Sequence, residues 1–148
     1  MTVTTLRQLL GQRELHRVAT TTSLRAAARL MAEHAVGAVA VFEGTRFAGI
    51  LTERDIVFRG IARDLALDTA TAAEVMTPDP VTVDMDDAIS DALAAKLGDA
   101  FRHLPVMEDG NVVALLSYRD IPAEYVMLFE RFRMMSSAHA DDALRQDR

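Results

Sequence analysis

Two short polar segments carry the residue types in this sequence that could bind a ligand, Thr52-Glu-Arg-Asp55 and Ser117-Tyr-Arg-Asp120. Each follows an apolar run and places a hydroxyl three residues before a carboxylate. If each segment begins a helix, its free backbone N–H groups and the positive end of the helix dipole attract phosphate. The hydroxyl could donate to a phosphate oxygen, and the carboxylate could accept from two vicinal ribose hydroxyls. The spacing therefore predicts a site for a nucleotide monophosphate unit in each segment.

A structural interpretation of the same spacing stays open. A Thr or Ser followed three residues later by an acid is also a capping box, which needs no ligand. One isolated copy would favour the capping box, whereas two copies at equivalent places favour a shared ligand role. Arg54 and Arg119, which precede the two acids, add a planar and permanently charged cation to each segment.

Arg102 and His103 form a second candidate pair, directly before the apolar run 104–107. The guanidinium fork and one imidazole N–H can both bind phosphate, although solvated residues before a buried strand would look the same. Gly37 and Ala38 stand at the equivalent places in the first half and provide no cation. We therefore expect two sites that bind phosphate unequally, with the second site preferred.

Residue patterns for catalysis or metal binding are missing from the sequence. Cysteine is absent, and the four histidines lack metal-ligand spacing. No nucleophile elbow, Walker loop or glycine-rich dinucleotide fingerprint occurs. Asp86 and Asp87 are interpreted as the N-cap region of a helix rather than as an acid pair. We predict no catalytic residues and no metal site.

The two polar segments are equivalent positions of an internal repeat. A shift of 65 residues pairs 17–56 with 82–121 without a gap and gives nine identical positions in forty. The matches cluster where 38–56 lies over 103–121, a stretch that includes both Arg-Asp-Ile triplets. Because each copy of a sequence repeat folds as a similar unit, we expect two related sites.

Each copy has the pattern of a β-α-β-β-α unit. In the first copy, a strand over 18–20 precedes a helix whose apolar residues recur every three or four positions from Leu24 to Ala35. Apolar runs at 38–42 and 47–51 flank a Glu-Gly-Thr turn, which is typical of a hairpin. The equivalent elements of the second copy are a strand at 81–83, a helix over 89–97 and strands at 104–107 and 112–116. The pattern predicts a mixed α/β (α+β) fold.

The segments outside the repeat are shorter and more polar. Residues 71–76 predict a helix that Pro78 and Pro80 end, and residues 121–132 predict a last helix with one apolar face. From residue 136 the chain is polar and predicted to fray. The expected division is an N-terminal helical segment 1–16, a first repeat 17–66, a connector 67–80, a second repeat 81–133 and a C-terminal tail 134–148.

Composition narrows the classes of function. The 148 residues carry a net charge of −6, which argues against a general nucleic-acid binder. Uncharged stretches reach only nine residues, too short to span a membrane. The N-terminus lacks the apolar run of a signal peptide. We expect a soluble, cytoplasmic protein.

Taken together, these motifs resemble the cystathionine-β-synthase (CBS) domain pair, or Bateman module. The resemblance rests on GILTERD (49–55), EVMT (74–77) before PVTV (80–83), RHLPV (102–106) and the second S-x-R-D (117–120). It covers about 17–133 and is similar to bacterial stand-alone pairs labelled inosine-monophosphate-dehydrogenase-related. It implies two pseudo-twofold-related repeats packed through their sheets, with two clefts for AMP, ADP, ATP, NAD(H) or S-adenosylmethionine.

The resemblance also implies roles for individual residues. Asp55 and Asp120 would hold ribose, with Thr52 and Ser117 as the hydroxyl positions. The adenine slots would be lined by residues on and near the strands: Ala38, Val39, His103, Leu104, Ile50 and Leu115. Ala114 replaces the glycine usual before the second motif, so its methyl group is expected to narrow that cleft. Family members commonly form dimers through their helices, which fits the apolar face of 121–132.

Two functions from different classes follow. The first is a sensor that binds an adenosine nucleotide and signals to a separate protein partner, without membrane or nucleic-acid binding. The second is an enzyme that processes a nucleotide, such as a hydrolase, which would need a nucleophile or carboxylate cluster that the sequence does not show. A nucleic-acid binder is a third reading, disfavoured by the acidic charge.

Overall fold

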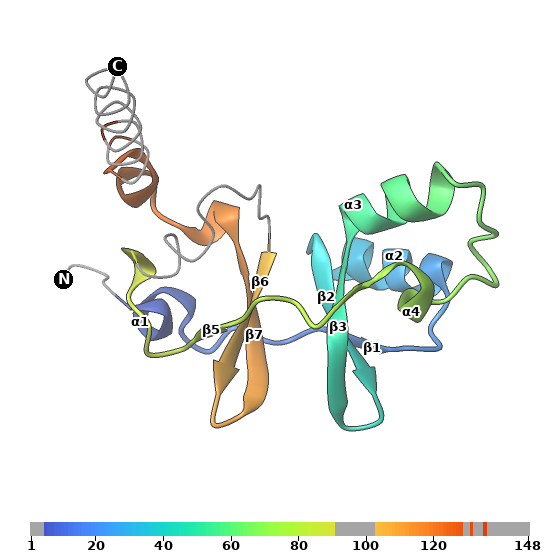
Figure 1. Cartoon of the computed structure of the whole chain (residues 1–148), viewed down its shortest axis with the longest axis horizontal. Helices are drawn as coiled ribbons and strands as arrows, with labels where there is room; N and C mark the ends of the chain where they lie inside the picture. The colour runs from blue at the N-terminus through green and yellow to red at the C-terminus, as the bar shows by residue number, and fades with distance from the viewer. Residues whose placement is uncertain (1–4, 91–102, 129–130, 132–134, 136–148) are drawn as a thin grey trace, which may run out of the picture.

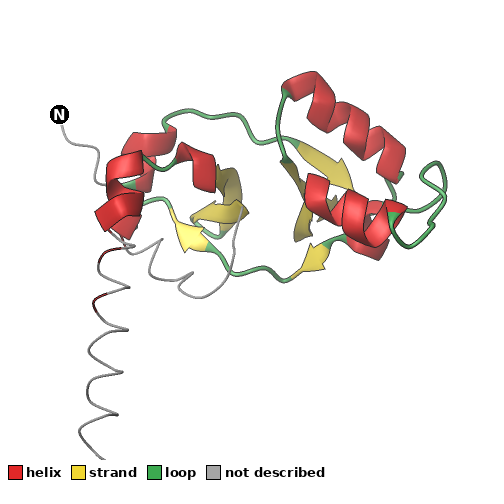
Figure 2. Ribbon diagram, turned by 90° about the horizontal axis from the view of Figure 1, so that it is seen from above, coloured by secondary structure: helices red, strands yellow, loops and turns green. Residues whose placement is uncertain are grey.

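The computed structural model describes residues 5–90, 103–128, 131 and 135. They form two small sheets that lie side by side, with helices on the outer sides of both (Figure 1). Seen from above, two loops cross between the two halves (Figure 2). This arrangement confirms the predicted mixed fold of two repeats. Within the described residues, no helix is long and apolar enough to cross a lipid bilayer.

The first repeat contains a four-stranded sheet in the order β1-β2-β3-β4. The strands are β1 (Arg17–Ala19), β2 (Ala38–Glu43), β3 (Arg46–Thr52) and β4 (Thr77–Pro78). Between β1 and β2 the chain forms α2 (Leu24–His34), whose N-cap Ser23 accepts a hydrogen bond from the Ala26 N–H. After β3 it forms α3 (Glu53–Asp55), which continues as a π-helical segment, η1 (Ile56–Ile61). The short α4 (Ala72–Val75) follows before β4.

The second repeat contains a three-stranded sheet in the order β5-β6-β7. Its elements are β5 (Val83–Asp84), β6 (His103–Glu108), β7 (Asn111–Ser117) and the 3-10 turn η2 (Tyr118–Asp120). A helix follows over 123–128. The sheet repeats the register of the first one: Val18 pairs with Val41 in parallel, as Val83 does with Val106. Both hairpins also bulge at the same equivalent place, directly after the second valine of these pairs.

Alternate side chains along the strands belong either to the core of one repeat or to an interface that the two repeats share. Fully buried Val39 and Leu51 belong to the first core, and fully buried Leu104 and Leu116 belong to the second. A third apolar cluster, formed by Ala40, Phe42 and Val112 with Leu15, Phe47 and Met107 around them, lies between the sheets. The repeats therefore pack through their sheets, as predicted.

The short helix that precedes each repeat in the sequence packs on the core of the other repeat. The N-terminal α1 (Leu6–Leu10) packs on the second core, where Leu6 is fully buried, and Thr5 forms a bridge with Ala88. In the same way α4 packs on the first core, and Thr71 forms a bridge with Ser23. α1 precedes the first repeat but packs on the second, and α4 precedes the second repeat but packs on the first.

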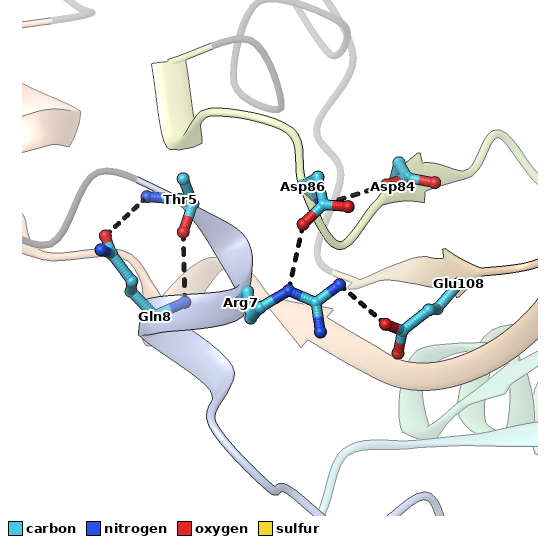
Figure 3. A network of polar contacts seen from close by, with 6 residues as sticks. All are labelled: Thr5, Arg7, Gln8, Asp84, Asp86 and Glu108. Carbon is cyan, nitrogen blue, oxygen red and sulfur yellow. Dashed lines mark hydrogen bonds and ion pairs between the residues drawn. The ribbon is translucent and has the colours of Figure 1, made fainter.

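Arg7 adds a polar attachment for α1 (Figure 3). Its Nε lies 3.0 Å from Asp86 Oδ1, and its Nη2 lies 2.7 Å from Glu108 Oε1. The hydrogen bonds to Asp86 and Glu108 raise the pKa of the Arg7 guanidinium above its ordinary value, so it stays charged. Beside it, Thr5 and Gln8 form a capping box at the start of the helix.

Strand β4 is the element that the sequence analysis missed. The connector 67–80 was predicted to contain only a helix over 71–76, and α4 does end at Val75, but Thr77 and Pro78 then pair with β3 at its edge. Gly49 makes this possible, because a Cβ there would lie 2.5 Å from the Thr77 carbonyl oxygen. The predicted helix over 89–97 and the tail from 136 extend into residues outside the described ones.

Candidate functional site

A cavity of about 1180 Å³ opens between the two repeats. One wall comes from the first repeat, with side chains of α2, the residues after it and η1. The other comes from β6, β7 and η2. The segment 13–16 joins the two walls, because Arg13 pairs with Asp120 while the His16 ring stacks on His34 of α2. Six of the residues predicted for the site line this cavity: Ala38, His103, Leu115, Ser117, Arg119 and Asp120.

Asp120 is positioned by the end of strand β7. Its Oδ2 accepts a hydrogen bond from the Ser117 N–H at 2.8 Å, and the Ser117 hydroxyl accepts one from the Arg119 N–H at 3.3 Å. The same Oδ2 lies 2.5 Å from Arg13 Nη1. Within the described part of the chain, no group donates to Oδ1. The carboxylate therefore caps the turn and still has acceptor capacity toward the cavity.

The equivalent residues of the first repeat form a complete capping box. Thr52 Oγ1 accepts from the Asp55 N–H at 3.1 Å, and Asp55 Oδ2 accepts from the Thr52 N–H at 3.0 Å. Arg59 Nε lies 3.9 Å from Asp55 Oδ1. Thr52 and Asp55 do not line the described cavity. Capping is thus a real role of both aspartates, and it leaves the carboxylates partly unsatisfied.

Other predicted residues are placed away from the cavity. Val39 and Leu104 are fully buried, one in each core, so their side chains face away from the space between the repeats. Ile50 is 5% exposed and pairs with Ala40 on β2. The Arg54 guanidinium lies 4.7 Å from the centre of the Phe58 ring on η1. Arg102 lies outside the described residues.

The methyl group of Ala114 does not narrow the cavity. Ala114 is 3% exposed and packs in the second core, and it is not among the cavity residues. The expectation that it narrows the second cleft was therefore wrong, because alternation on β7 turns Leu115 and Ser117, and not Ala114, toward the cavity. The glycine at the first-repeat position is explained by β4, which has no counterpart beside Ala114 in the described part of the chain.

The sequence analysis also missed the N-terminal segment of the site. Arg13, Glu14 and His16 line the cavity, and so does Glu53. The comparison of the repeats began at residue 17 and therefore excluded the first three of them. A signal was present: Thr5 and Gln8 have the same spacing as Thr71 and Glu74, and both pairs form capping boxes before a helix. This match extends the repeat toward the N-terminus and would have placed residues 13–16 beside the sheets.

The cavity offers binding groups of both charges. Arg13 and Arg119 face Glu14, Glu53 and Asp120, with apolar wall from α2 and β7. In the described part of the chain, no three His, Asp or Glu side chains are arranged to hold a metal ion. The arrangement suits a ligand that combines a polar hydroxylated part, an anionic part and a flat apolar part.

Comparisons with known proteins agree with this picture. The CBS domain family model matches residues 7–60 and 72–124. The CBS domain-containing protein CBSCBSPB5 of Arabidopsis thaliana is 38% identical over 111 residues, which cover 74% of this chain and 20% of that protein. The chain thus spans about a fifth of the length of this curated relative.

Two solved structures extend the comparison. The structure of the CBS domain NE2398 is 30% identical, with a TM-score of 0.72 over 78% of this chain and 92% of that one. The CBS domain protein PAE2072 of Pyrobaculum aerophilum, solved in complex with AMP, is 25% identical, with a TM-score of 0.74 over 86% of this chain and 98% of that one. On the matched residues and the duplicated fold, the chain belongs to the CBS domain family and contains two copies of the domain.

Proposed function

We propose that this protein is a regulatory module that binds an adenosine nucleotide beside Asp120 and signals its occupancy to a separate protein. The observation that carries the proposal is the cavity, which brings Ser117, Arg119 and Asp120 of one repeat against Ala38 of the other. The AMP bound to PAE2072 supports an adenosine ligand for this fold. Because both repeats form its walls, a bound nucleotide would stabilise one relative placement of the two sheets.

Each part of a nucleotide has a partner in the cavity. Asp120 accepts from the ribose hydroxyls, while Arg119 and His103, with Arg102 beside it in sequence, bind the phosphate. The guanidinium of Arg119 has no partner among the described residues, so it is available. Ala38 and Leu115 provide apolar surface for the base, and Val39 and Leu104 support the strands from the two cores. Ile50 pairs with Ala40 on β2 and supports the same sheet.

A second, weaker site is proposed at Asp55. Thr52 and Asp55 have the same capping geometry, and Arg54 precedes the acid. The residues equivalent to the α2 wall, 93–100, lie outside the described residues. Without cations at Gly37 and Ala38, this site is expected to prefer ligands that carry less phosphate.

Binding is tested by calorimetry on protein from which endogenous nucleotide has been removed. AMP, ADP, ATP and NAD(H) are titrated, with GMP as the base control, and released ligands are identified by mass spectrometry. We expect an adenosine compound to bind and Asp120→Asn to weaken it about ten- to a hundredfold. Asp109→Asn, in the exposed hairpin turn, is the matched control and should bind normally. Absence of binding by any adenosine compound would refute the proposal.

The enzyme alternative is tested in the same samples. A hydrolase would convert AMP, ATP or NAD during incubation, whereas a sensor returns them unchanged. Retention of DNA or RNA at physiological salt would instead favour a nucleic-acid binder. We propose a cytoplasmic sensor and expect neither result.

We also propose that two copies associate through their helical faces. Phe58 on η1 is about half exposed and does not line the nucleotide cavity, and Met127 and Leu128 are exposed on the last helix. Exposed apolar clusters of this kind are typical of interaction surfaces. Light scattering should give the mass of a dimer, and Phe58→Glu should shift it toward the monomer. A monomeric unmodified protein would contradict the proposed dimer.

A further inference from the structure

Arg13 already forms an ion pair with Asp120, the carboxylate that would bind the ribose of the nucleotide. Its Nη1 lies 2.5 Å from Asp120 Oδ2, and both side chains line the cavity. The Asp120 side chain is 17% exposed and the Arg13 side chain 40%. Arg13 comes from the segment between α1 and β1, far from Asp120 in sequence, so the contact joins the N-terminal segment to the proposed ribose site.

The pairing uses up one carboxylate oxygen. A carboxylate oxygen has two acceptor positions, and Asp120 Oδ2 already accepts from the Ser117 N–H at 2.8 Å as well as from Arg13. Oδ1 has no donor among the described residues. When a vicinal diol binds a carboxylate in the bidentate manner, it donates one hydroxyl to each oxygen, so its second hydroxyl would need the position that Arg13 holds. Since the Ser117 N–H is fixed in the backbone, Arg13 is the donor that can leave.

The first repeat has no counterpart of this contact. The positions equivalent to Arg13, 65 or 66 residues on, are Pro78 and Asp79, and neither is a cation. Among the described residues, Asp55 Oδ2 accepts only from the Thr52 N–H, and Arg59 Nε lies 3.9 Å from Oδ1, too far for a hydrogen bond. Ribose at Asp55 would therefore displace no strong donor. The carboxylate oxygen that is already paired with an arginine is therefore a property of the Asp120 site.

Arg13 is able to exchange partners. Its backbone is held by a hydrogen bond from its N–H to the Leu10 carbonyl at 3.2 Å, while its long side chain is substantially exposed. A guanidinium remains charged when it leaves Asp120, so a new anion in the same cavity compensates it. A phosphate group is such an anion, and it binds a guanidinium through two parallel hydrogen bonds.

We propose that Arg13 makes the Asp120 site select nucleotides over nucleosides, by exchanging the Asp120 carboxylate for the phosphate of the ligand. This inference rests on the proposed function, because it assumes an adenosine ligand at Asp120. A nucleoside must displace Arg13 without offering it a new partner, whereas a nucleotide offers one. Arg13 thereby opposes ribose binding alone and favours ribose binding accompanied by phosphate.

The test compares AMP with adenosine on the full chain, by calorimetry. Unmodified protein should bind AMP more tightly than adenosine. Arg13→Ala should change the two affinities in opposite directions: adenosine binds about two- to fivefold tighter because an exposed competing ion pair is gone. AMP binds about tenfold weaker because a charged phosphate contact is lost. Arg13→Lys, which keeps the charge but loses the planar fork, should fall between the two.

Arg46→Ala is the matched control, since Arg46 pairs with Glu43 in an exposed hairpin away from the cavity. It should leave both affinities unchanged, and circular dichroism should show that every variant is folded. If Arg13→Ala weakens both ligands alike, or changes neither, while unmodified protein binds AMP, the exchange is refuted and the proposed function stands. If unmodified protein binds no adenosine compound at all, the proposed function is refuted, and this inference with it.

Discussion

At the scale of residues, the two aspartates serve the fold before any ligand arrives. Asp55 and Asp120 both accept from the backbone N–H three residues earlier, where a strand turns into a helical segment. The capping-box interpretation of the sequence and the ligand interpretation are thus compatible, since a carboxylate has more acceptor positions than the cap uses. Effects on stability and on binding must be measured separately at these positions.

Asp55→Ala should lower the free energy of unfolding by about 0.5–2 kcal/mol, because the Thr52 N–H loses its acceptor and the capping box of α3 loses one of its two hydrogen bonds. Asp55→Asn retains an acceptor oxygen for the Thr52 N–H and should cost less. Urea unfolding of the three proteins measures both effects. Equal losses in the two variants would contradict a cap that depends on the acceptor oxygen.

Gly49→Ala should lower the free energy of unfolding by about 1–3 kcal/mol, because the added Cβ would lie 2.5 Å from the backbone oxygen of Thr77. Ala114→Gly at the equivalent position removes a buried methyl group without any such contact. Its cost should be about 1 kcal/mol or less. Chemical unfolding that gave the reverse order would mean that β4 does not press against β3 at this place.

At the scale of elements, the exchange of α1 and α4 determines which residues stabilise which core. Leu6 is fully buried against the second core, close to the start of the chain. The helix has only five residues, too few to be stable alone, so packing and the ion pairs of Arg7 must hold it in place.

Leu6→Ala should lower the free energy of unfolding by about 2–5 kcal/mol, as expected for a leucine lost from a core. Leu9→Ala, one turn away and only partly buried, is the matched control and should cost clearly less. Thermal and urea unfolding measure both. Similar small losses for the two variants would show that α1 is not packed on the second core.

The local elements could be predicted from the sequence, and their exchange could not. Apolar runs around Gly44 and Gly110 predicted both hairpins, since strand alternation and turn residues are local signals. The placement of α1 depends on contacts between residues about 80 positions apart, such as Thr5 with Ala88. The same holds for the site: the Asp120 motif is local, but Arg13 reaches it only through that long-range packing.

At the scale of the whole molecule, the two repeats are expected to unfold together. Each core includes the short helix that precedes the other repeat, and the apolar cluster around Phe42 and Val112 joins the two sheets. Loss of either core therefore removes contacts from both. A two-state transition is the usual behaviour of such a small cooperative unit.

The two tyrosines allow a direct test, because both, at 118 and 125, belong to the second half of the chain and tryptophan is absent. Leu51→Ala in the first core should shift the urea midpoint of tyrosine fluorescence as much as that of circular dichroism. A tyrosine signal that stayed at its original midpoint while circular dichroism shifted would show that the repeats unfold independently.

The helix exchange also bears on how such a chain could arise by duplication. A half-length chain with one repeat carries a helix that its own core does not use and lacks the helix that its core needs. Two copies of that half-length chain could associate so that the helix of each packs on the core of the other. The contacts would be those that α1 and α4 make within this single chain. Gene fusion would then convert a symmetric association of two identical chains into one, and each half could diverge separately. Arg13, which has no cationic equivalent after α4, is divergence of this kind, and we propose that it gives the two sites different ligand preferences.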